Sequence, residues 1–188
     1  MEKKMSRFLA LLLLAGLLGG CSVVAIRKHE PGYKNVRALQ SQKASFRLSG
    51  VRGRDEYVER SLSSKSLLCR LTTFNMPAGQ TVADYIRQAL TDELDAAQRL
   101  SMGGTVLEIT VLRLDSNSLS PMQGAWDLEF EYSYAGRRRK IKTVYKFESA
   151  IDGQVACRNT AQAFSDALAQ NFAEFYKSLG PAGKKSAK

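Results

Sequence analysis

The stretch WDLEFEYSYAGRRRKIKTVYKF, residues 126–147, alternates apolar and polar side chains on both sides of a central Ala-Gly pair. A period of two residues is typical of a β-strand with one buried face. A two-residue loop at Ala135-Gly136 therefore predicts a β-hairpin. Alanine is a poor residue for the positive φ of such a turn, so a one-residue bulge at the tip is the alternative. The hairpin sets apolar against apolar and acid against base in four predicted pairs: Trp126–Tyr145, Phe130–Ile141, Glu129–Lys142 and Glu131–Lys140.

Three more segments have strand patterns. The stretch TVLEITVLRLDS (105–116) is nearly continuous in apolar residues, which predicts a strand buried on both faces. Residues 45–52 form a shorter strand pattern, and residues 66–74 are apolar and β-branched enough to predict a central strand.

Two segments have the spacing of amphipathic helices. One begins at Thr81, with Asp84 completing an acidic variant of the capping box, and continues to about residue 100. The other begins at Asn159, with Gln162 as its capping partner, after the short extended piece QVAC, and it ends before Gly180. The order β-β-α-β-β-β-α predicts a single α+β domain, in which a mainly antiparallel sheet carries two helices on one face.

The N-terminus has the pattern of an exported chain. Basic residues precede an apolar run from Phe8 to Leu18, and this run is shorter than the roughly 20 residues that span a bilayer. The tetrad LGGC that ends at Cys21 resembles the lipobox of bacterial lipoproteins, which implies cleavage before Cys21 and acylation of its thiol. By the same resemblance Ser22, in place of Asp, implies sorting to the outer membrane. The alternative is an ordinary signal peptide with an incidental cysteine.

The remaining chain is predicted to contain one folded domain between two irregular segments. The segment before the domain holds His29, Pro31 and Gly32 and has no apolar period, so we expect a flexible tether there. The predicted parts are a signal peptide (1–20), an acylated cysteine with its tether (21–43), the α+β domain (44–179) and a disordered basic tail (180–188).

The chain is basic, with a formal net charge of +10. Basic charge favours nucleic acid as a partner, but an exported, lipid-anchored protein does not ordinarily meet it. We therefore expect attachment to the membrane through Cys21, and an envelope protein or anionic lipid as a further partner. The predicted contact residues lie in the run GRRRKIK (136–142); they are Arg137, Arg138, Arg139 and Lys140. The alternative is a charged strand that discourages edge association.

The remaining residue chemistry favours binding over catalysis. Cys69 and Cys157 are candidates for a disulfide in an oxidising envelope, or for two buried free thiols. His29 is the only histidine and falls in the predicted tether, so no Ser-His or Cys-His pair is expected. The same residues provide no metal-ligand spacing and no cofactor motif. We therefore predict a protein that is not an enzyme and holds neither metal nor cofactor.

Three stretches together resemble a known group of proteins. They are TTFNMPAGQTVADYIRQALTDELDAAQRL, GGTVLEITVLRLDSNSLSPMQGAWDLEFEYSYAG and NTAQAFSDALAQNFAEFYKSL. They resemble the YajG-type lipoproteins and, more distantly, the auxiliary lipoproteins of ABC-type lipid transporters. The first resemblance implies a non-enzymatic outer-membrane lipoprotein that faces the periplasm and binds or assembles with an envelope component. The second implies an auxiliary subunit of an intermembrane transport system.

Overall fold

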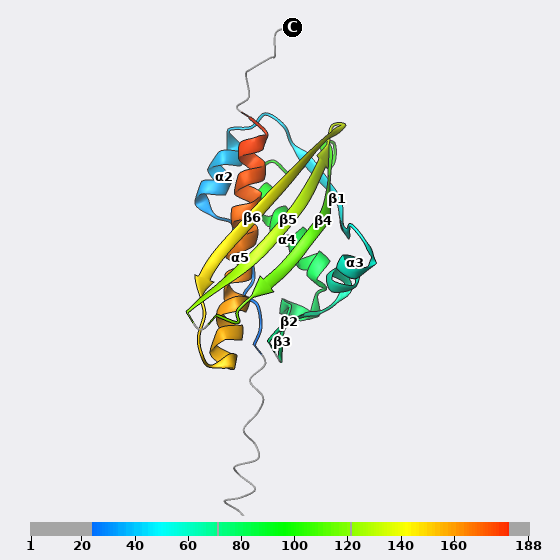
Figure 1. Ribbon diagram of the computed structural model, residues 1–188. Coiled ribbons are helices and arrows are strands. Elements are labelled where there is room, and N and C mark those ends of the chain that lie inside the picture. The colour runs from blue at the N-terminus through cyan, green and yellow to red at the C-terminus, as the bar shows by residue number, and fades with distance from the viewer. Residues whose placement is uncertain (1–23, 71, 121, 181–188) are drawn as a thin grey trace, which may run out of the picture.

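The computed structural model describes residues 24–70, 72–120 and 122–180, so Cys21, the predicted signal peptide and the predicted tail from residue 181 lie outside it (Figure 1). The predicted α+β class is confirmed. A four-stranded sheet has the order β1-β4-β5-β6, and α4 and α5 cover one of its faces. The elements are α2 (Tyr33–Gln40), β1 (Phe46–Gly53), α3 (Glu56–Ser63), β2 (Ser66–Cys69), β3 (Thr72–Asn75), the short 3-10 helix η1 (Pro77–Gly79), α4 (Val82–Ala96), β4 (Thr105–Asn117), β5 (Gln123–Tyr134), β6 (Arg137–Glu148) and α5 (Gly153–Ser178).

The hairpin of β5 and β6 has the predicted register, with no bulge at its tip. All four predicted cross-strand pairs are present. Ala135 and Gly136 have φ values of 47° and 72°, so both turn residues adopt the left-handed conformation of a type I′ turn. Because alternate side chains of the two strands share a face, this register buries one face of the hairpin and leaves the charged face open.

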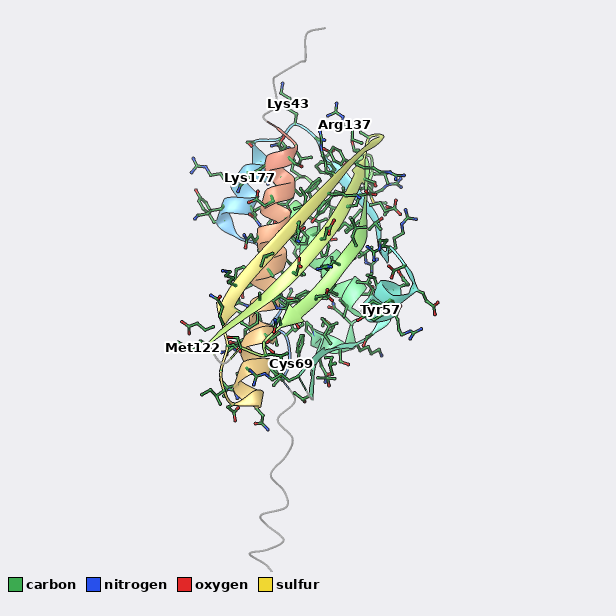
Figure 2. The ribbon with its side chains drawn as sticks, in the orientation of Figure 1. Lys43, Tyr57, Cys69, Met122, Arg137 and Lys177 are labelled. Carbon is green, nitrogen blue, oxygen red and sulfur yellow. A yellow bond between two sulfur atoms is a disulfide. The ribbon has the colours of Figure 1, made fainter. Side chains whose placement is uncertain are left out.

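The sheet is mixed, because β1 pairs in parallel with β4 while the β4–β5 and β5–β6 pairs are antiparallel. The prediction that β4 is buried on both faces is wrong. Its buried residues alternate, with Leu107, Ile109 and Val111 fully covered. The described helices cover one face of the sheet, and the other face carries charged side chains of β4, β5 and β6 (Figure 2).

The predicted central strand at 66–74 is wrong as well. The chain reverses after Arg70, whose φ is 51°, and residues 66–75 become β2 and β3, a separate antiparallel pair. A further helix that was not predicted, α3, precedes this pair and begins at Asp55, whose side chain accepts a hydrogen bond from the amide of Val58. Apolar and β-branched content alone does not distinguish one long strand from two short ones.

The segment predicted as a tether is folded from its first described residues. The amides of Ile26 and Asn75 donate hydrogen bonds to the carbonyls of Asn75 and Val24, which attaches the segment to β3. Helix α2 follows and packs on α5, with Leu39 fully buried. The sequence did not predict this structure, because the segment is mostly polar and the partners of its few buried residues are distant in the sequence.

The helices that cover the sheet begin at side-chain caps. Thr81 accepts a hydrogen bond from the amide of Asp84 at the start of α4, as predicted. Helix α5 begins at Asp152 rather than at Asn159, because the Asp152 carboxylate caps the amide of Val155, and the QVAC piece is therefore helical. The long α5 forms the centre of the core. Its Phe175 ring stacks on Tyr132 with the ring centroids 4.0 Å apart, and its Phe164 ring contacts Trp126 with the centroids 4.6 Å apart.

Candidate functional site

The sheet has two ends that differ in composition. We call the end with the Ala135-Gly136 turn the hairpin end. The opposite end, where β4 and β6 finish and α5 begins, is the disulfide end. Figure 2 shows Lys43 and Arg137 at the hairpin end and Cys69 and Met122 at the other. A strand rises about 3.4 Å per residue, so the 12 residues of β5 separate the ends by about 40 Å.

The hairpin end has a shallow basic hollow of about 410 Å³. Three arginines line it: Arg52 from β1, and Arg137 and Arg138 from the start of β6. Glu108 of β4 also lines the hollow, and its carboxylate accepts from the guanidinium of Arg52 at 3.1 Å. Arg137 and Arg138 are both exposed, and Arg138 lies 3.9 Å from the Glu131 carboxylate. Three arginines against one glutamate in the lining leave the hollow with net positive charge.

The structure does not gather the four predicted contact residues into one patch. Residues that are paired across two strands share a face of the sheet. Lys140 therefore lies with its partner Glu131 on the open face, whereas Arg139 lies with Tyr132 on the face that α5 covers. Only Arg137 and Arg138 line the hollow, together with Arg52, which the sequence analysis missed. Its only sequence signal was a basic residue at the end of the predicted strand 45–52.

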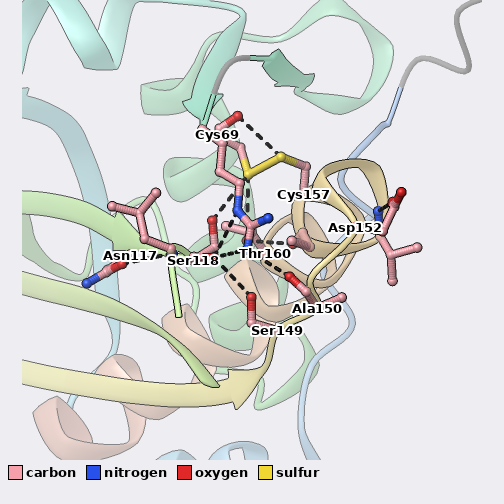
Figure 3. Close-up of a disulfide and its surroundings, with 12 residues drawn as sticks. Cys69, Asn117, Ser118, Ser149, Ala150, Asp152, Cys157 and Thr160 are labelled. Atoms are coloured by element: carbon pink, nitrogen blue, oxygen red, sulfur yellow. Dashed lines mark hydrogen bonds between the residues drawn. A yellow bond between two sulfur atoms is a disulfide. The ribbon is translucent and has the colours of Figure 1, made fainter. Parts of the chain in front are cut away.

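The disulfide end is built around a bond between Cys69 and Cys157, whose Cα atoms are 5.6 Å apart (Figure 3). It joins the end of β2 to the second turn of α5. Both cysteines are buried, so reductants have little access to them. This burial fits a structural bond better than a redox-active one.

Arg70 connects three chain segments beside the disulfide. Its guanidinium donates to the carbonyl oxygens of Ser118, Ala150 at 2.8 Å and Ile151 at 3.1 Å. Ser149 adds two contacts, from its hydroxyl to the Ser118 carbonyl at 3.1 Å and from its amide to the Met122 carbonyl at 3.1 Å. The β4–β5 and β6–α5 loops are therefore held against the β2–β3 turn.

A buried polar row connects the N-terminal segment to α4 and α5. His29 lies between Ser165 and Glu93: Nδ1 is 3.0 Å from the serine Oγ, and Nε2 is 3.2 Å from the glutamate Oε1. Glu93 also accepts from the Asn35 side-chain amide at 2.9 Å and from the Tyr176 hydroxyl at 2.8 Å. His29 is only 3% exposed and Glu93 is fully buried. Burial and the negative charge of Glu93 raise the pKa of Tyr176 well above its ordinary value.

This row corrects the prediction that His29 has no serine nearby. A Ser-His-Glu order resembles a nucleophile, a base and an orienting acid. Ser165, however, is only 4% exposed and lies in the middle of α5, where the backbone amides are already bonded within the helix. The sequence did contain one signal: Glu93 interrupts the apolar face of α4, and a buried acid requires partners.

A small apolar hollow of about 240 Å³ lies next to this row. His29 and Tyr85 line it together with Pro77 and Ala78 of η1, but Ser165 does not. Burial raises the pKa of Tyr85 to about 12, so its hydroxyl stays protonated, and it donates to the carbonyl of Arg27 at 2.9 Å. The hollow is smaller than the pockets of about 300–1,000 Å³ that enclose drug-sized ligands.

Between residues 24 and 180, apart from the undescribed positions 71 and 121, no helix is long and apolar enough to cross a membrane. The same part of the chain contains no cluster of three or more His, Cys, Asp or Glu side chains arranged to hold a metal ion.

No protein-family model and no curated protein matches this sequence. Solved structures do match the fold. A Xanthomonas campestris protein of the DUF330 family aligns at a TM-score of 0.58 and 14% identity, over 85% of this chain and 94% of its own. An uncharacterised protein aligns at a TM-score of 0.50 and 11% sequence identity, over 85% of this chain and 100% of its own. A Caulobacter crescentus protein described as a candidate lipoprotein aligns at a TM-score of 0.42 and 12% sequence identity. This alignment covers 77% of this chain and 91% of that protein.

At these identities the first two matches show the fold alone. The alignments span nearly the whole length of those proteins, so the described α+β unit corresponds to a complete domain of the same kind. The narrower resemblance to YajG-type lipoproteins stays a prediction.

Proposed function

We propose that the chain is a non-enzymatic lipoprotein, anchored through Cys21 to the periplasmic face of the outer membrane, and that its hairpin end binds an anionic group of another envelope component. The observation that carries the proposal is the placement of the basic hollow. It lies about 40 Å from the disulfide end, and the described chain begins beside β3, which belongs to that end. An anchor just before Val24 leaves the hollow facing away from its own membrane.

The charge and shape of the hollow favour a planar anion. Arginine presents several donors in a fixed geometry that matches carboxylate and phosphate groups. The basic tail of the sequence follows α5, whose last residues, near Lys177, lie at the same end (Figure 2). Because the hollow is shallow and its arginines are exposed, it suits an acidic protein surface best as a partner.

The buried Ser-His-Glu row supports a binding protein rather than a hydrolase. Ser165 is covered, does not line the neighbouring hollow and has no free backbone amides around it for an oxyanion. The row instead satisfies Glu93 with three donors, as a buried carboxylate requires.

The anchor is tested by labelling cells with radioactive palmitate. We expect the wild-type protein to carry label and to fractionate with the outer membrane, and Cys21→Ser to lose both. An unlabelled wild-type protein, or a Cys21→Ser variant that keeps the label, contradicts the anchor.

The hollow is tested with a photo-crosslinking residue placed at Arg138 in cells, with Lys146 at the far end of β6 as the matched position. We expect a defined crosslinked partner from position 138 only, which Arg52→Glu on the opposite wall removes. The same partner from both positions, or from neither, contradicts the proposal.

A second candidate is an auxiliary subunit of an ABC-type lipid transporter. The edge strand β6 favours it, because 12 residues at the border of the sheet are placed to pair with another subunit. Purification of the lipidated protein in mild detergent tests this candidate by recovery of transporter subunits, and their absence under conditions that preserve the transporter argues against it.

A further inference from the structure

We propose that the disulfide end rests directly on the lipid bilayer, with exposed apolar side chains of the β4–β5 loop, the β6–α5 loop, β2 and the start of α5 inserted among the lipids. This inference rests on the proposed acylation of Cys21 and adds an orientation and a contact surface to it. The occupant is the phospholipid surface of the leaflet that holds the anchor.

The first argument is the short reach between the anchor and the folded body. Val24 already belongs to the fold, because its carbonyl accepts a hydrogen bond from the amide of Asn75. An extended chain spans at most about 3.6 Å per residue, so the three steps from Cys21 to Val24 cover at most about 11 Å. The folded domain therefore lies close to the membrane, and the end of the domain that is nearest to Val24 must face the membrane.

The direction of the chain identifies that end. Residue 25 pairs in parallel with Asn75 of β3, so the chain followed backwards from Val24 leads toward the beginning of β3. That beginning, Thr72, is paired with Cys69 beside the disulfide. Figure 1 shows the first described residues (blue) beside β3 at this end of the molecule.

The second argument is a set of exposed apolar side chains at the same end, which we call the apolar rim. It comprises Leu68 (69% exposed), Leu119 (76%), Met122 (82%), Ile151 (85%) and Val155 (39%). A single exposed apolar residue needs no explanation, but several at one end mark an interaction surface. Amphipathic membrane-binding proteins use such residues at the interface.

The rim is held in place from within. Arg70 binds the carbonyls of Ser118 and Ile151, and the Ser149 amide binds the carbonyl of Met122. These bonds fix the backbone of the loops that carry three rim residues. The backbone at Ser118, Met122 and Ile151 is therefore tied to the body of the domain by hydrogen bonds.

Bilayer depth is measured by tryptophan quenching in the lipidated protein. The protein is reconstituted into vesicles of phosphatidylethanolamine and phosphatidylglycerol that carry bromine on their acyl chains. Leu119→Trp and Ile151→Trp report the rim, and Met102→Trp is the matched control, because Met102 is 86% exposed and lies just before β4, at the hairpin end. The native Trp126 is buried and common to all variants.

We expect strong quenching and a blue-shifted emission for both rim variants, and neither for the control. Equal quenching of all three variants, or quenching of none, overturns the inference. A crosslink from position 119 to a protein, together with unquenched tryptophan, assigns the rim to a protein partner and also overturns it.

A second measurement does not depend on acylation. The mature chain with Cys21→Ser is sedimented with the same vesicles without bromine, beside a form that adds Leu119→Glu, Met122→Glu and Ile151→Glu. These side chains are exposed, so folding is retained. Each contributes about tenfold to binding when lipids cover it, so we expect the triple change to weaken binding by about a thousandfold.

Equal binding of the two forms overturns the inference, while Met102→Glu should leave binding unchanged. The mass of the N-terminal peptide in wild-type protein separates the two proposals. An unmodified Cys21 removes the anchor but leaves the sedimentation result to decide the rim. An acylated Cys21 with an unquenched rim removes only the rim.

Discussion

The two ends of the sheet are assembled from different kinds of neighbours. At the hairpin end, β5 and β6 are joined by two residues, and the local sequence alone fixes their pairing. At the disulfide end, the β2–β3 turn, the β4–β5 loop and the start of α5 come from distant parts of the chain, and a covalent bond spanning 88 residues together with Arg70 holds them. Bringing distant segments together costs more chain entropy than closing a short turn. The disulfide and the Arg70 hydrogen bonds therefore lie at the end where the cost in chain entropy is greater.

The largest effect should follow from removal of the disulfide. A Cys69→Ser, Cys157→Ser double variant loses a crosslink with a sequence separation of 88, which corresponds to about 4.6 kcal/mol in the free energy of unfolding. Denaturant unfolding measures this loss, and hydrogen exchange should show β2 and β3 losing protection before β5 and β6. Uniform loss of protection at both ends contradicts the comparison.

Glu93 tests whether the N-terminal segment is held independently of either end. Glu93→Ala leaves the donors of His29, Asn35 and Tyr176 without their acceptor and should cost about 3 kcal/mol. Protease cleavage in residues 24–43 should increase. Glu93→Gln, which keeps one acceptor oxygen, should cost less, and Asp95→Ala on the exposed side of α4 should cost little. Equal losses for the buried and exposed positions would show that the row does not hold this segment.

A substitution in the turn at the hairpin end should make the protein more stable. Ala135 has a φ of 47°, and asparagine adopts this region at lower cost than alanine. We expect Ala135→Asn to raise the free energy of unfolding by about 0.5–1 kcal/mol, measured as a higher Tm. Gly136→Ala, at a φ of 72°, should have the opposite sign. A lower Tm for both variants contradicts the assigned turn.

The smallest expected effect is a dependence of stability on acid at the start of α4. The Thr81 hydroxyl, which donates to the carboxylate, lowers the pKa of Asp84 below its ordinary 3.8. A lowered pKa in the folded state stabilises the protein above the unfolded value, and this contribution is lost as pH falls through the folded value. Asp84→Asn should therefore flatten the stability profile below about pH 4, by less than about 1 kcal/mol because the side chain is half exposed. Thr81→Ser, which keeps the hydroxyl, should retain the wild-type profile.

The same contrast explains which features the sequence could predict. The register of β5 and β6 follows from alternation and a two-residue loop, so every piece of information lies within 22 residues. The parallel pairing of β1 with β4 joins Phe46 to Thr105, and no local pattern specifies it. Residues 66–75 have a strand composition, and only the reversal at Arg70 divides them.

The candidate sites show the same limit. The arginines that follow the turn were predicted as a cluster, but their division between faces and the addition of Arg52 depend on the assembled sheet. His29 was placed in a tether because its partners Glu93 and Ser165 are 64 and 136 residues away. A buried acid on the apolar face of α4 was the one local sign that a polar partner would come from elsewhere.

Helix α5 is the last of the described elements, which has a consequence for the order of folding. This helix supplies Cys157, Ser165 and Phe175, which complete the disulfide, the polar row and the aromatic core. Of the described elements a ribosome makes it last, so the sheet of β1, β4, β5 and β6 lacks this covering helix while most of the described chain already exists. The hairpin of β5 and β6 can form early from local contacts. The native state must then await the final helix, and a nascent chain needs protection from association until residue 178 has emerged.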